Sequence, residues 1–142
     1  MGFPDSGKAS TYADMFGGRS TSNGDIYSHN EYSAALLPRE RWYDLPMGTR
    51  LRLTYQGRQI VVKVNDRGAG KTTKDKATGK RITVDDGRVL DLSRAAYAYL
   101  IGRAVNTITD ANAGVIELDA ILVVPPATQL GPIGKSAQGA NP

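Results

Sequence analysis

Hydrophobic and polar residues alternate along two neighbouring stretches in the middle of the chain. Apolar or aromatic side chains occupy every second position over residues 51–55, and branched apolar side chains do so over residues 60–64. A period of two is typical of strands with one buried face. The dipeptide Gln56-Gly57 separates the two stretches, and a short glycine turn of this kind joins antiparallel strands. The sequence therefore predicts a β-hairpin here.

Three further stretches are expected to be strands: Lys8–Tyr12, Arg88–Leu92 and Val115–Val124. The alternation in the third stretch predicts a strand in a barrel wall, with one face exposed to solvent. Its apolar face would carry Ile116, Leu118, Ala120, Leu122 and Val124, and its polar face Glu117 and Asp119. One helix is predicted over residues 94–101, because the Ser93 hydroxyl can cap its first turn and Gly102 can end it.

The composition narrows the class of protein. A chain of 142 residues has room for one domain, and 16 glycines with only 2 Phe and 1 Trp favour a β-rich, loop-rich fold. Many short strands and one short helix predict a small closed barrel. No cysteine is present, which excludes disulfides and thiolate chemistry, and His29 alone argues against a histidine zinc site or a Ser-His-Asp triad. We therefore expect no cofactor and no metal.

The net charge of +4 is concentrated in one place. Residues 71–88 hold six basic residues against three acidic ones, and they are expected to form a solvated loop. Because this segment has no aromatic residue on which a base could stack, no nucleic-acid partner is expected. Residues 125–142 are rich in Pro and Gly and predict a flexible tail. No run of 18 apolar residues exists, so no membrane span is expected.

Acid–base chemistry in such a chain falls to carboxylates. Asp66 follows a predicted strand and begins a Gly-rich loop, Asp91 lies between apolar neighbours at a strand-to-helix junction, and Asp25 lies in a predicted turn. An aspartate among apolar residues is either a structural hydrogen-bond acceptor or a group with a raised pKa. The local pattern alone leaves these two interpretations open.

Five segments, in order, resemble motifs of one family. Residues 7–12 (GKASTY) resemble G-x-A-S-W-Y, and residues 18–27 (GRSTSNGDIY) resemble G-x-x-T-A-N-G-E-x-[YF]. Residues 45–53 (LPMGTRLRL) resemble L-P-x-G-T-x-V-x-V. Residues 61–68 (VVKVNDRG) resemble V-V-V-x-V-N-D-R-G-P, and residues 90–96 (LDLSRAA) resemble I-D-L-S-x-A-A. Together they are similar to the RlpA-like double-psi β-barrel family, related in fold to expansins and the lytic transglycosylase MltA.

The resemblance implies a mainly β, six-stranded double-psi β-barrel over residues 7–124, with residues 1–6 as an N-terminal extension. It also implies a groove for peptidoglycan glycan strands. Asp66 would be the general acid/base of a lytic transglycosylase, with Asp91 and Asp25 as further acidic residues. Such an enzyme protonates the glycosidic oxygen and then takes the proton of the muramoyl C6 hydroxyl as an anhydro ring closes. The residues expected to bind substrate are Tyr12, Asn23, Tyr27, Asn65, Arg67 and Ser93.

The sequence departs from the family pattern at several positions. Leu36 stands where the family has His, Ser28 replaces an Asp, and Thr11 replaces the opening Trp. The loops after Leu36 and after Asp66 are longer than in the family, and His29 is not expected to substitute for the missing His. Two hypotheses follow: an active glycan-strand lyase, or a catalytically degenerate barrel that binds peptidoglycan or has a structural role.

Residues 1–8 (MGFPDSGK) have no apolar stretch after a charged start, so no secretory signal is predicted. A cell-wall-type barrel without a leader is expected in a bacteriophage tail. A periplasmic or cell-envelope location is the alternative if a leader has been removed. In a virion, residues 71–88 and the C-terminal tail are the segments expected to contact other tail proteins.

Overall fold

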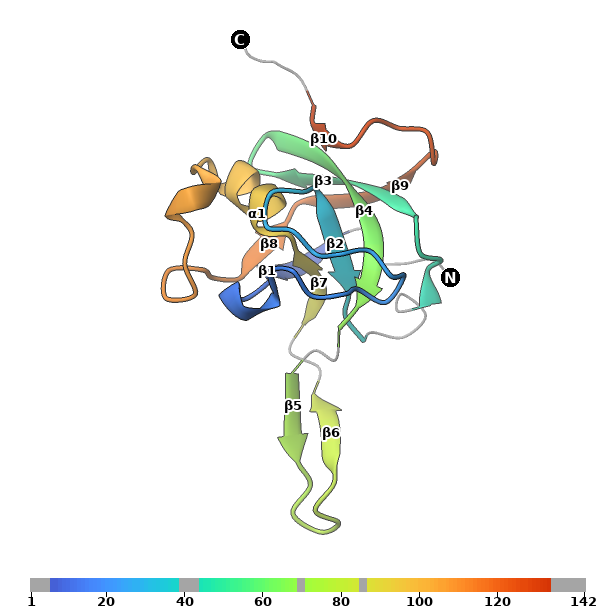
Figure 1. Cartoon of the computed structure of the whole chain (residues 1–142), viewed down its shortest axis with the longest axis vertical. Helices are drawn as coiled ribbons and strands as arrows, with labels where there is room; N and C mark the ends of the chain where they lie inside the picture. The colour runs from blue at the N-terminus through green and yellow to red at the C-terminus, as the bar shows by residue number, and fades with distance from the viewer. Residues whose placement is uncertain (1–5, 39–43, 69–70, 85–86, 134–142) are drawn as a thin grey trace.

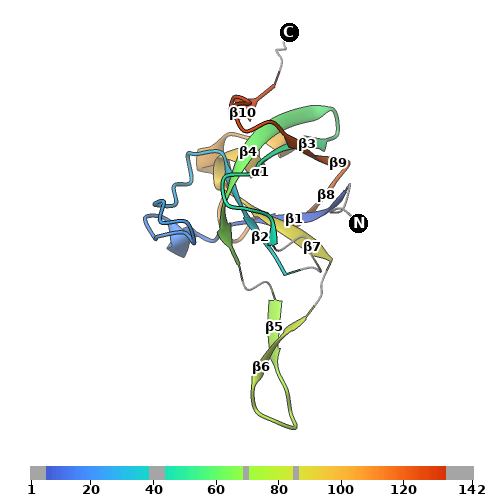
Figure 2. The same cartoon turned by 90° about the vertical axis from the view of Figure 1, so that its right-hand side faces the viewer.

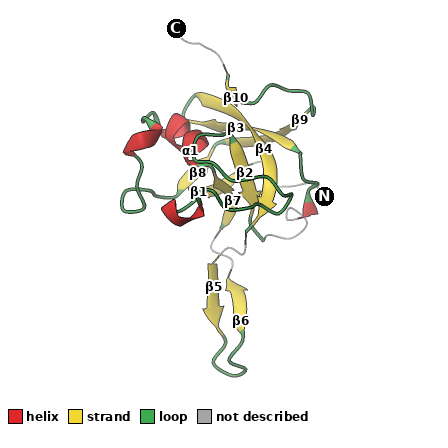
Figure 3. Cartoon of the chain, in the orientation of Figure 1, coloured by secondary structure: helices red, strands yellow, loops and turns green. Residues whose placement is uncertain are grey.

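The computed structural model describes residues 6–38, 44–68, 71–84 and 87–133. The protein is mostly β with one α-helix, as the sequence predicts (Figure 1; Figure 3). The strands are β1 (Gly7–Thr11), β2 (Ser33–Leu36), β3 (Arg50–Tyr55), β4 (Arg58–Arg67), β5 (Lys71–Lys74), β6 (Arg81–Val84), β7 (Arg88–Leu92), β8 (Ile116–Leu118), β9 (Ala120–Val124) and β10 (Gly131–Pro132). The helix α1 (Arg94–Ile101) is accompanied by two 3₁₀ turns, η1 (Asp14–Phe16) and η3 (Val105–Thr107).

Eight strands form one strongly curved sheet, two more than the six predicted. Its order is β8-β1-β7-β2-β4-β3-β9, with β10 attached to β4. The end strands β8 and β9 are separated in the chain by Asp119 alone, so one bent segment reaches both ends of the sheet and nearly closes it. Figure 2 shows the resulting barrel from the side.

Two parallel strand pairs meet in the middle of the sheet. β1 runs parallel to β7, β2 runs parallel to β4, and β2 and β7 pair antiparallel between them. Parallel neighbours cannot be joined by a tight hairpin, so long loops must cross over the barrel. The barrel interior is filled by aliphatic side chains, among them Leu51, Leu53, Val62, Leu90 and Leu92, all fully buried.

The predicted hairpin is present as β3 and β4. All six residues of β3 pair with β4, from Arg50 opposite Lys63 to Tyr55 opposite Arg58. The two turn residues Gln56 and Gly57 have φ values of 49° and 85°. Two successive left-handed residues are the mark of the type I′ turn, whose twist matches the strands that it joins.

The predicted single strand over residues 115–124 is wrong in its second half. The strand breaks at Asp119, whose carboxylate accepts a hydrogen bond of 2.7 Å from the backbone N–H of Gln56. The break shifts the alternation by one residue. Ile121 is therefore buried, whereas Leu122, predicted to face the core, is 49% exposed.

Two segments predicted to be irregular contain strands. Within residues 71–88, β5 and β6 pair antiparallel and project away from the barrel (Figure 1). In the C-terminal tail, Gly131 and Pro132 pair with Val61 and Ile60 of β4. Residues 134–142 of that tail lie outside the described part of the chain.

The helix has the predicted ends, and its first residue is an anchor that the sequence did not reveal. The Ser93 hydroxyl accepts the Ala96 N–H, and Gly102 ends the helix in the left-handed region. Arg94 is 3% exposed, and its guanidinium donates to the backbone oxygens of Tyr12 and Ile108. It also pairs with the carboxylates of Asp14, at 2.8 Å, and Asp110, at 2.5 Å. These bonds tie the segment after β1 to the helix.

We predict that Arg94→Met lowers the free energy of unfolding by about 2 to 4 kcal/mol, because two buried carbonyls lose their donor and the carboxylates lose their cation. Urea denaturation measures this loss. Arg103→Met is the control: the Arg103 side chain is exposed and, among the described residues, makes one long hydrogen bond, so the stability loss should stay below about 0.5 kcal/mol. Equal losses for the two variants would contradict the anchoring role.

Candidate active site

One cleft of about 520 Å³ lies across the barrel wall and contains two of the three predicted acids. Asp66 and Asp91 both line it, from β4 and β7. The remaining walls include Tyr12, Phe16, Arg67 and Arg88. The family resemblance implies that Asp66 and Asp91 could form a pair across the barrel, and the sheet brings them to one surface although they are 25 positions apart in the chain.

The two acids flank a single small residue of the strand between them. Ala35 of β2 is the register partner of Asp91 on one side and of Asp66 on the other. Since neighbouring strands lie about 4.8 Å apart, the two aspartate backbones are about 10 Å apart. The Ala35 methyl between them is 1% exposed and packs with Tyr12 and Tyr27, and all three residues of this row, Asp91, Ala35 and Asp66, line the cleft.

A β-bulge turns Asp66 toward this cleft. Ala34 pairs with Val64 and Ala35 pairs with Asp66, so Asn65 has no partner on β2. The residues Ile60, Val62 and Val64 all face the core, and strict alternation would send residue 66 there as well. The extra residue reverses the alternation, as bulges beside functional sites commonly do.

Asp66 is held by four hydrogen bonds from three residues. The Tyr12 hydroxyl donates to Oδ2 at 2.7 Å. The Ser22 N–H, the Ser22 hydroxyl and the Arg67 N–H donate to Oδ1 at 2.9, 2.7 and 2.9 Å. Both carboxylate oxygens are therefore used as acceptors, which suits a fixed negative charge better than a proton donor.

Asp91 lies in a different environment. Burial raises its pKa from 3.8 to about 6, and the charge of Asp66 across β2 adds to this rise. Among the described residues, the Ser10 hydroxyl supplies the single hydrogen bond to the Asp91 carboxylate, at 3.1 Å. The same hydroxyl accepts a hydrogen bond from the Arg88 guanidinium at 2.8 Å. The hydrogen bond from Ser10 and the charge of Arg88 partly offset the rise. A carboxyl with this pKa is protonated in a large fraction of molecules in mildly acidic solution.

Tyr12 lines one side of the cleft, and Tyr27 stacks behind it. The rings of Tyr12 and Tyr27 stack with their centroids 4.0 Å apart, and the Tyr27 hydroxyl lies 2.8 Å from Nδ1 of His29. Burial raises the pKa of both phenols, so neither phenol ionises near neutral pH. Tyr12 reaches the cleft, but Tyr27 is 2% exposed and supports Tyr12 from behind.

Asp25, the third predicted acid, does not line the cleft. Its Oδ2 lies 3.1 Å from Nζ of Lys63 and accepts from the side-chain amides of Asn23 and Asn65. The hydrogen bond from Lys63 holds the pKa of Asp25 below its usual value, and those from Asn65 and Asn23 act in the same direction. This carboxylate is built as an ion-pair partner that ties the 18–27 loop to β4.

The predicted substrate-binding residues separate into two groups. Tyr12 and Arg67 line the cleft. Ser93 was predicted to bind substrate, but it is fully buried: its hydroxyl accepts the N–H groups of Ser33 and Ala96 within the core. Asn65 is also buried, at 2% exposure, and its amide faces Asp25.

Several side chains at or beside the cleft escaped the sequence prediction, Leu37 and Arg88 among them. Ser10 bonds Asp91, Ser22 bonds Asp66, and Phe16 and Arg19 form part of the wall, with the Arg19 guanidinium over the Phe16 ring. Ser10 and Ser22 lie inside the matched motif segments at 7–12 and 18–27, which was the available signal. Arg19 also lies inside the 18–27 segment, whereas Phe16 carried no signal beyond its closeness to these segments.

The family histidine position lies in the core. Leu36 is fully buried among the barrel aliphatics, and Leu37 is the residue of this pair that lines the cleft. His29 packs edge-on against Tyr27 and does not line the cleft. Among the described cleft residues, therefore, no imidazole accompanies the two aspartates.

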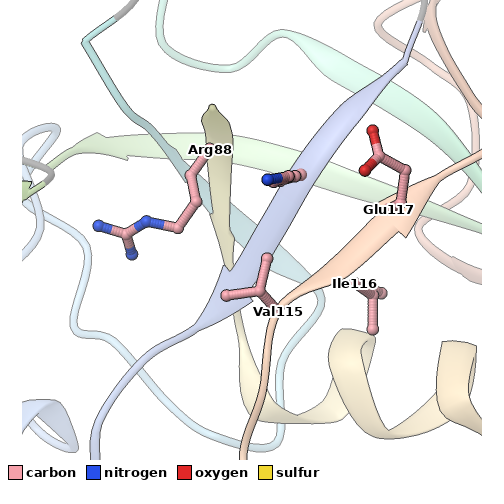
Figure 4. A pocket seen from close by; sticks show the side chains of 5 residues that line it. Arg88, Val115, Ile116 and Glu117 are labelled. Carbon is pink, nitrogen blue, oxygen red and sulfur yellow. The ribbon is translucent and has the colours of Figure 1, made fainter. Parts of the chain in front are cut away.

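A second concavity of about 400 Å³ lies over β1, between Arg88 of β7 and the residues at β8 (Figure 4). Lys8, Arg88, Val115, Ile116 and Glu117 line it, and Arg88 is common to it and to the cleft. In the described ranges, no cluster of three or more His, Asp or Glu side chains is placed to hold a metal ion. No described helix has the length and apolar character needed to cross a membrane.

Comparisons with known proteins agree on one family. A family model described as lytic transglycolase matches residues 5–119. The endolytic peptidoglycan transglycosylase RlpA of Vibrio cholerae serotype O1 is 40% identical over 101 residues, covering 71% of this chain and 31% of that protein. The protein of the same name from Yersinia pestis is 33% identical over 132 residues, covering 92% and 29%. The chain thus spans about a third of the length of these relatives.

Solved structures show the same fold. The apo expansin of Clavibacter michiganensis has a TM-score of 0.56 at 21% identity, covering 88% of this chain and 52% of that one. The Streptomyces papain inhibitor has a TM-score of 0.54 at 21% identity, covering 87% and 100%. At such identity the likeness concerns the fold alone. The resemblance that the motifs indicated is confirmed, and so is the double-psi β-barrel.

We predict that NMR titration of the carboxyl carbons gives Asp91 a pKa of about 6. Asp66→Asn should lower the pKa of Asp91, because the like charge across β2 is removed. Asp25→Asn is the control and should leave it unchanged, since Asp25 is bound to Lys63 outside the cleft. A pKa of Asp91 near 4 in the wild type would show that burial does not govern this carboxyl.

Proposed function

The chain belongs to the lytic transglycolase family, and from that membership we propose that it cleaves the glycan strands of peptidoglycan by intramolecular transglycosylation in the cleft over β2. The observation that carries the proposal is the pair of carboxyls on either side of Ala35. Asp91 is half-buried with a raised pKa, and Asp66 accepts four hydrogen bonds. Two like residues in unlike environments allow one to donate a proton while the other stays charged.

Asp91 is the proposed acid. In its protonated form it donates to the glycosidic oxygen as the bond from that oxygen to the muramoyl anomeric carbon breaks. The sequence pointed to Asp66 for this role, but both Asp66 oxygens already accept hydrogen bonds from Tyr12, Ser22 and Arg67. Asp91 accepts one, from Ser10, and has the pKa that mildly acidic catalysis needs.

The second half of the reaction uses the same group. Asp91, now a carboxylate, takes the proton of the muramoyl C6 hydroxyl as that oxygen bonds to the anomeric carbon and closes the anhydro ring. The proton balance of the enzyme is restored, and no water enters the product. Asp66 lies across the cleft as a fixed negative charge that stabilises the positive charge developing on the sugar in the transition state.

A second candidate function is binding without cleavage. Leu36 is buried in the core at the family's histidine position, and the described part of the cleft has no imidazole. A barrel in which both carboxyls serve only to bind sugar hydroxyls would fit that observation. A place in a bacteriophage tail, expected from the sequence, stays a prediction under either function.

We predict that Asp91→Asn abolishes the release of anhydromuramoyl products from peptide-stripped peptidoglycan, with a loss of at least about 100-fold. Asp66→Asn should lose less, because it removes a charge and not the transferred proton. Mass spectrometry of soluble products measures both. Asp119→Asn, at the bend between β8 and β9, is the matched control and should retain activity. Background-level product from the wild type would contradict cleavage and favour the binding function. A greater loss in Asp66→Asn than in Asp91→Asn would make Asp66 the acid and Asp91 the fixed negative charge.

We also predict a pH dependence with a defined sign. Cleavage should fall as pH rises above about 6, because Asp91 loses the proton that it donates.

The raised pKa of Asp91 also makes the stability of the fold depend on pH. The folded state binds more protons than the unfolded state between about pH 4 and 6, so wild-type stability falls as pH rises across that window. Relative to the wild type, Asp91→Asn should gain stability from pH 4 to pH 7, by at most about 3 kcal/mol. Thermal unfolding at both pH values measures this, and a constant difference would contradict it.

A further inference from the structure

The β5–β6 hairpin, residues 71–84, is an arm that the barrel does not need. It forms a separate two-stranded sheet and extends away from the barrel (Figure 1; Figure 2). An isolated two-stranded hairpin is marginally stable in water, and four residues of strand add about 13 Å of reach. Packing of the core therefore does not account for this arm.

The surface of the arm is cationic. Lys74, Lys76, Lys80 and Arg81 are all exposed, and among the described residues none of the three lysines has an ion-pair partner. The one described acid, Asp75, is used within the turn: its carboxylate accepts from the Ala77 N–H and the Thr78 hydroxyl. The turn therefore holds its own acid in place and leaves the lysine charges to the solvent.

Two of these cations stand directly opposite each other. Lys74 is the register partner of Arg81, and the Arg81 guanidinium is fixed along the same face by hydrogen bonds to Thr72. Like charges in a cross-strand pair destabilise a hairpin. A marginal hairpin that keeps such a pair gains from an anion that lies between the two charges.

Two residues that flank the arm in the sequence line the cleft. Gly68, just before the arm, and Arg88, just after it, both line the cleft that holds Asp66 and Asp91. A polymer chain that leaves the cleft at this end would pass along the arm.

We propose that the arm binds the carboxylates of a peptide-stripped glycan strand where the strand leaves the cleft. This inference rests on the proposed function. A muramoyl residue without its stem peptide exposes a lactyl carboxylate, so the stripped strand is a regular polyanion. Lys74, Lys76, Lys80 and Arg81 supply matching cations at a distance from the reacting bond. A nucleic acid fits less well, because residues 71–84 contain no aromatic side chain on which a base could stack.

The test measures binding with the full chain carrying Asp91→Asn, so that the strand stays intact. Adding Lys76→Gln/Lys80→Gln should weaken binding of long stripped strands about threefold or more, since each exposed ion pair contributes modestly. Amidating the lactyl carboxylates should have the same effect on the parent, and added salt should reduce the difference. Arg52→Gln/Arg103→Gln removes the same charge from the barrel and should leave binding unchanged.

Equal weakening by the two double variants, or no effect of amidation, would overturn the proposal. So would loss of binding to DNA or to another protein, with glycan binding intact. Cleavage of a short strand that fills only the cleft, measured with Asp91 present, separates this inference from the proposed function. The arm variant should cleave this short strand as the wild type does. Absence of product from both proteins would refute the proposed cleavage, and the binding measurement would still show whether the arm binds the glycan strand.

Discussion

The pairing of β2 with β7 on one side and β4 on the other is the constraint on which the site depends. It fixes Asp91 and Asp66 on either side of Ala35, although the two acids come from separate segments of the chain. The bulge at Asn65 then decides which face of β4 Asp66 occupies. A register slip of one residue in β4 would send that carboxyl toward the aliphatic core, where its charge would have no partner.

The two aspartates show how the fold gives one residue type two roles. Asp91 is set among buried strand residues with one hydroxyl as a donor, and burial favours its neutral form. Asp66 receives N–H and O–H groups from the segments around residues 12 and 22, which cross the end of β4. Arg94 holds the first of these segments through the Tyr12 carbonyl. The helix anchor and the cleft chemistry are therefore parts of one network.

Much of the framework could be predicted because it follows from local chemistry. Alternation and a glycine turn predict the β3–β4 hairpin, and a serine before an apolar run predicts the capped helix. Asp66 and Asp91 could be selected from motif context, but their shared cleft is a product of sheet order. The turn motif at Asp25 does not reveal that Lys63 lies 3.1 Å away, so the sequence could not show that this carboxylate lies outside the cleft. The burial of Ser93 follows from its position, because the residue that caps a buried helix is itself buried. The bend at Asp119 depends on a contact with Gln56 that is 63 positions distant, so alternation alone could not show it.

The central claim is that Asp91, and not Asp66, contacts the oxygen that is protonated. A crystal structure of Asp91→Asn with an intact peptide-stripped glycan strand tests this directly, because the variant keeps the shape of the side chain and cannot transfer the proton. The strand should lie in the cleft that Asp66 and residue 91 line, with one glycosidic oxygen within about 3 Å of the residue 91 amide. A strand bound elsewhere, or a glycosidic oxygen beside Asp66 and remote from residue 91, would contradict the claim.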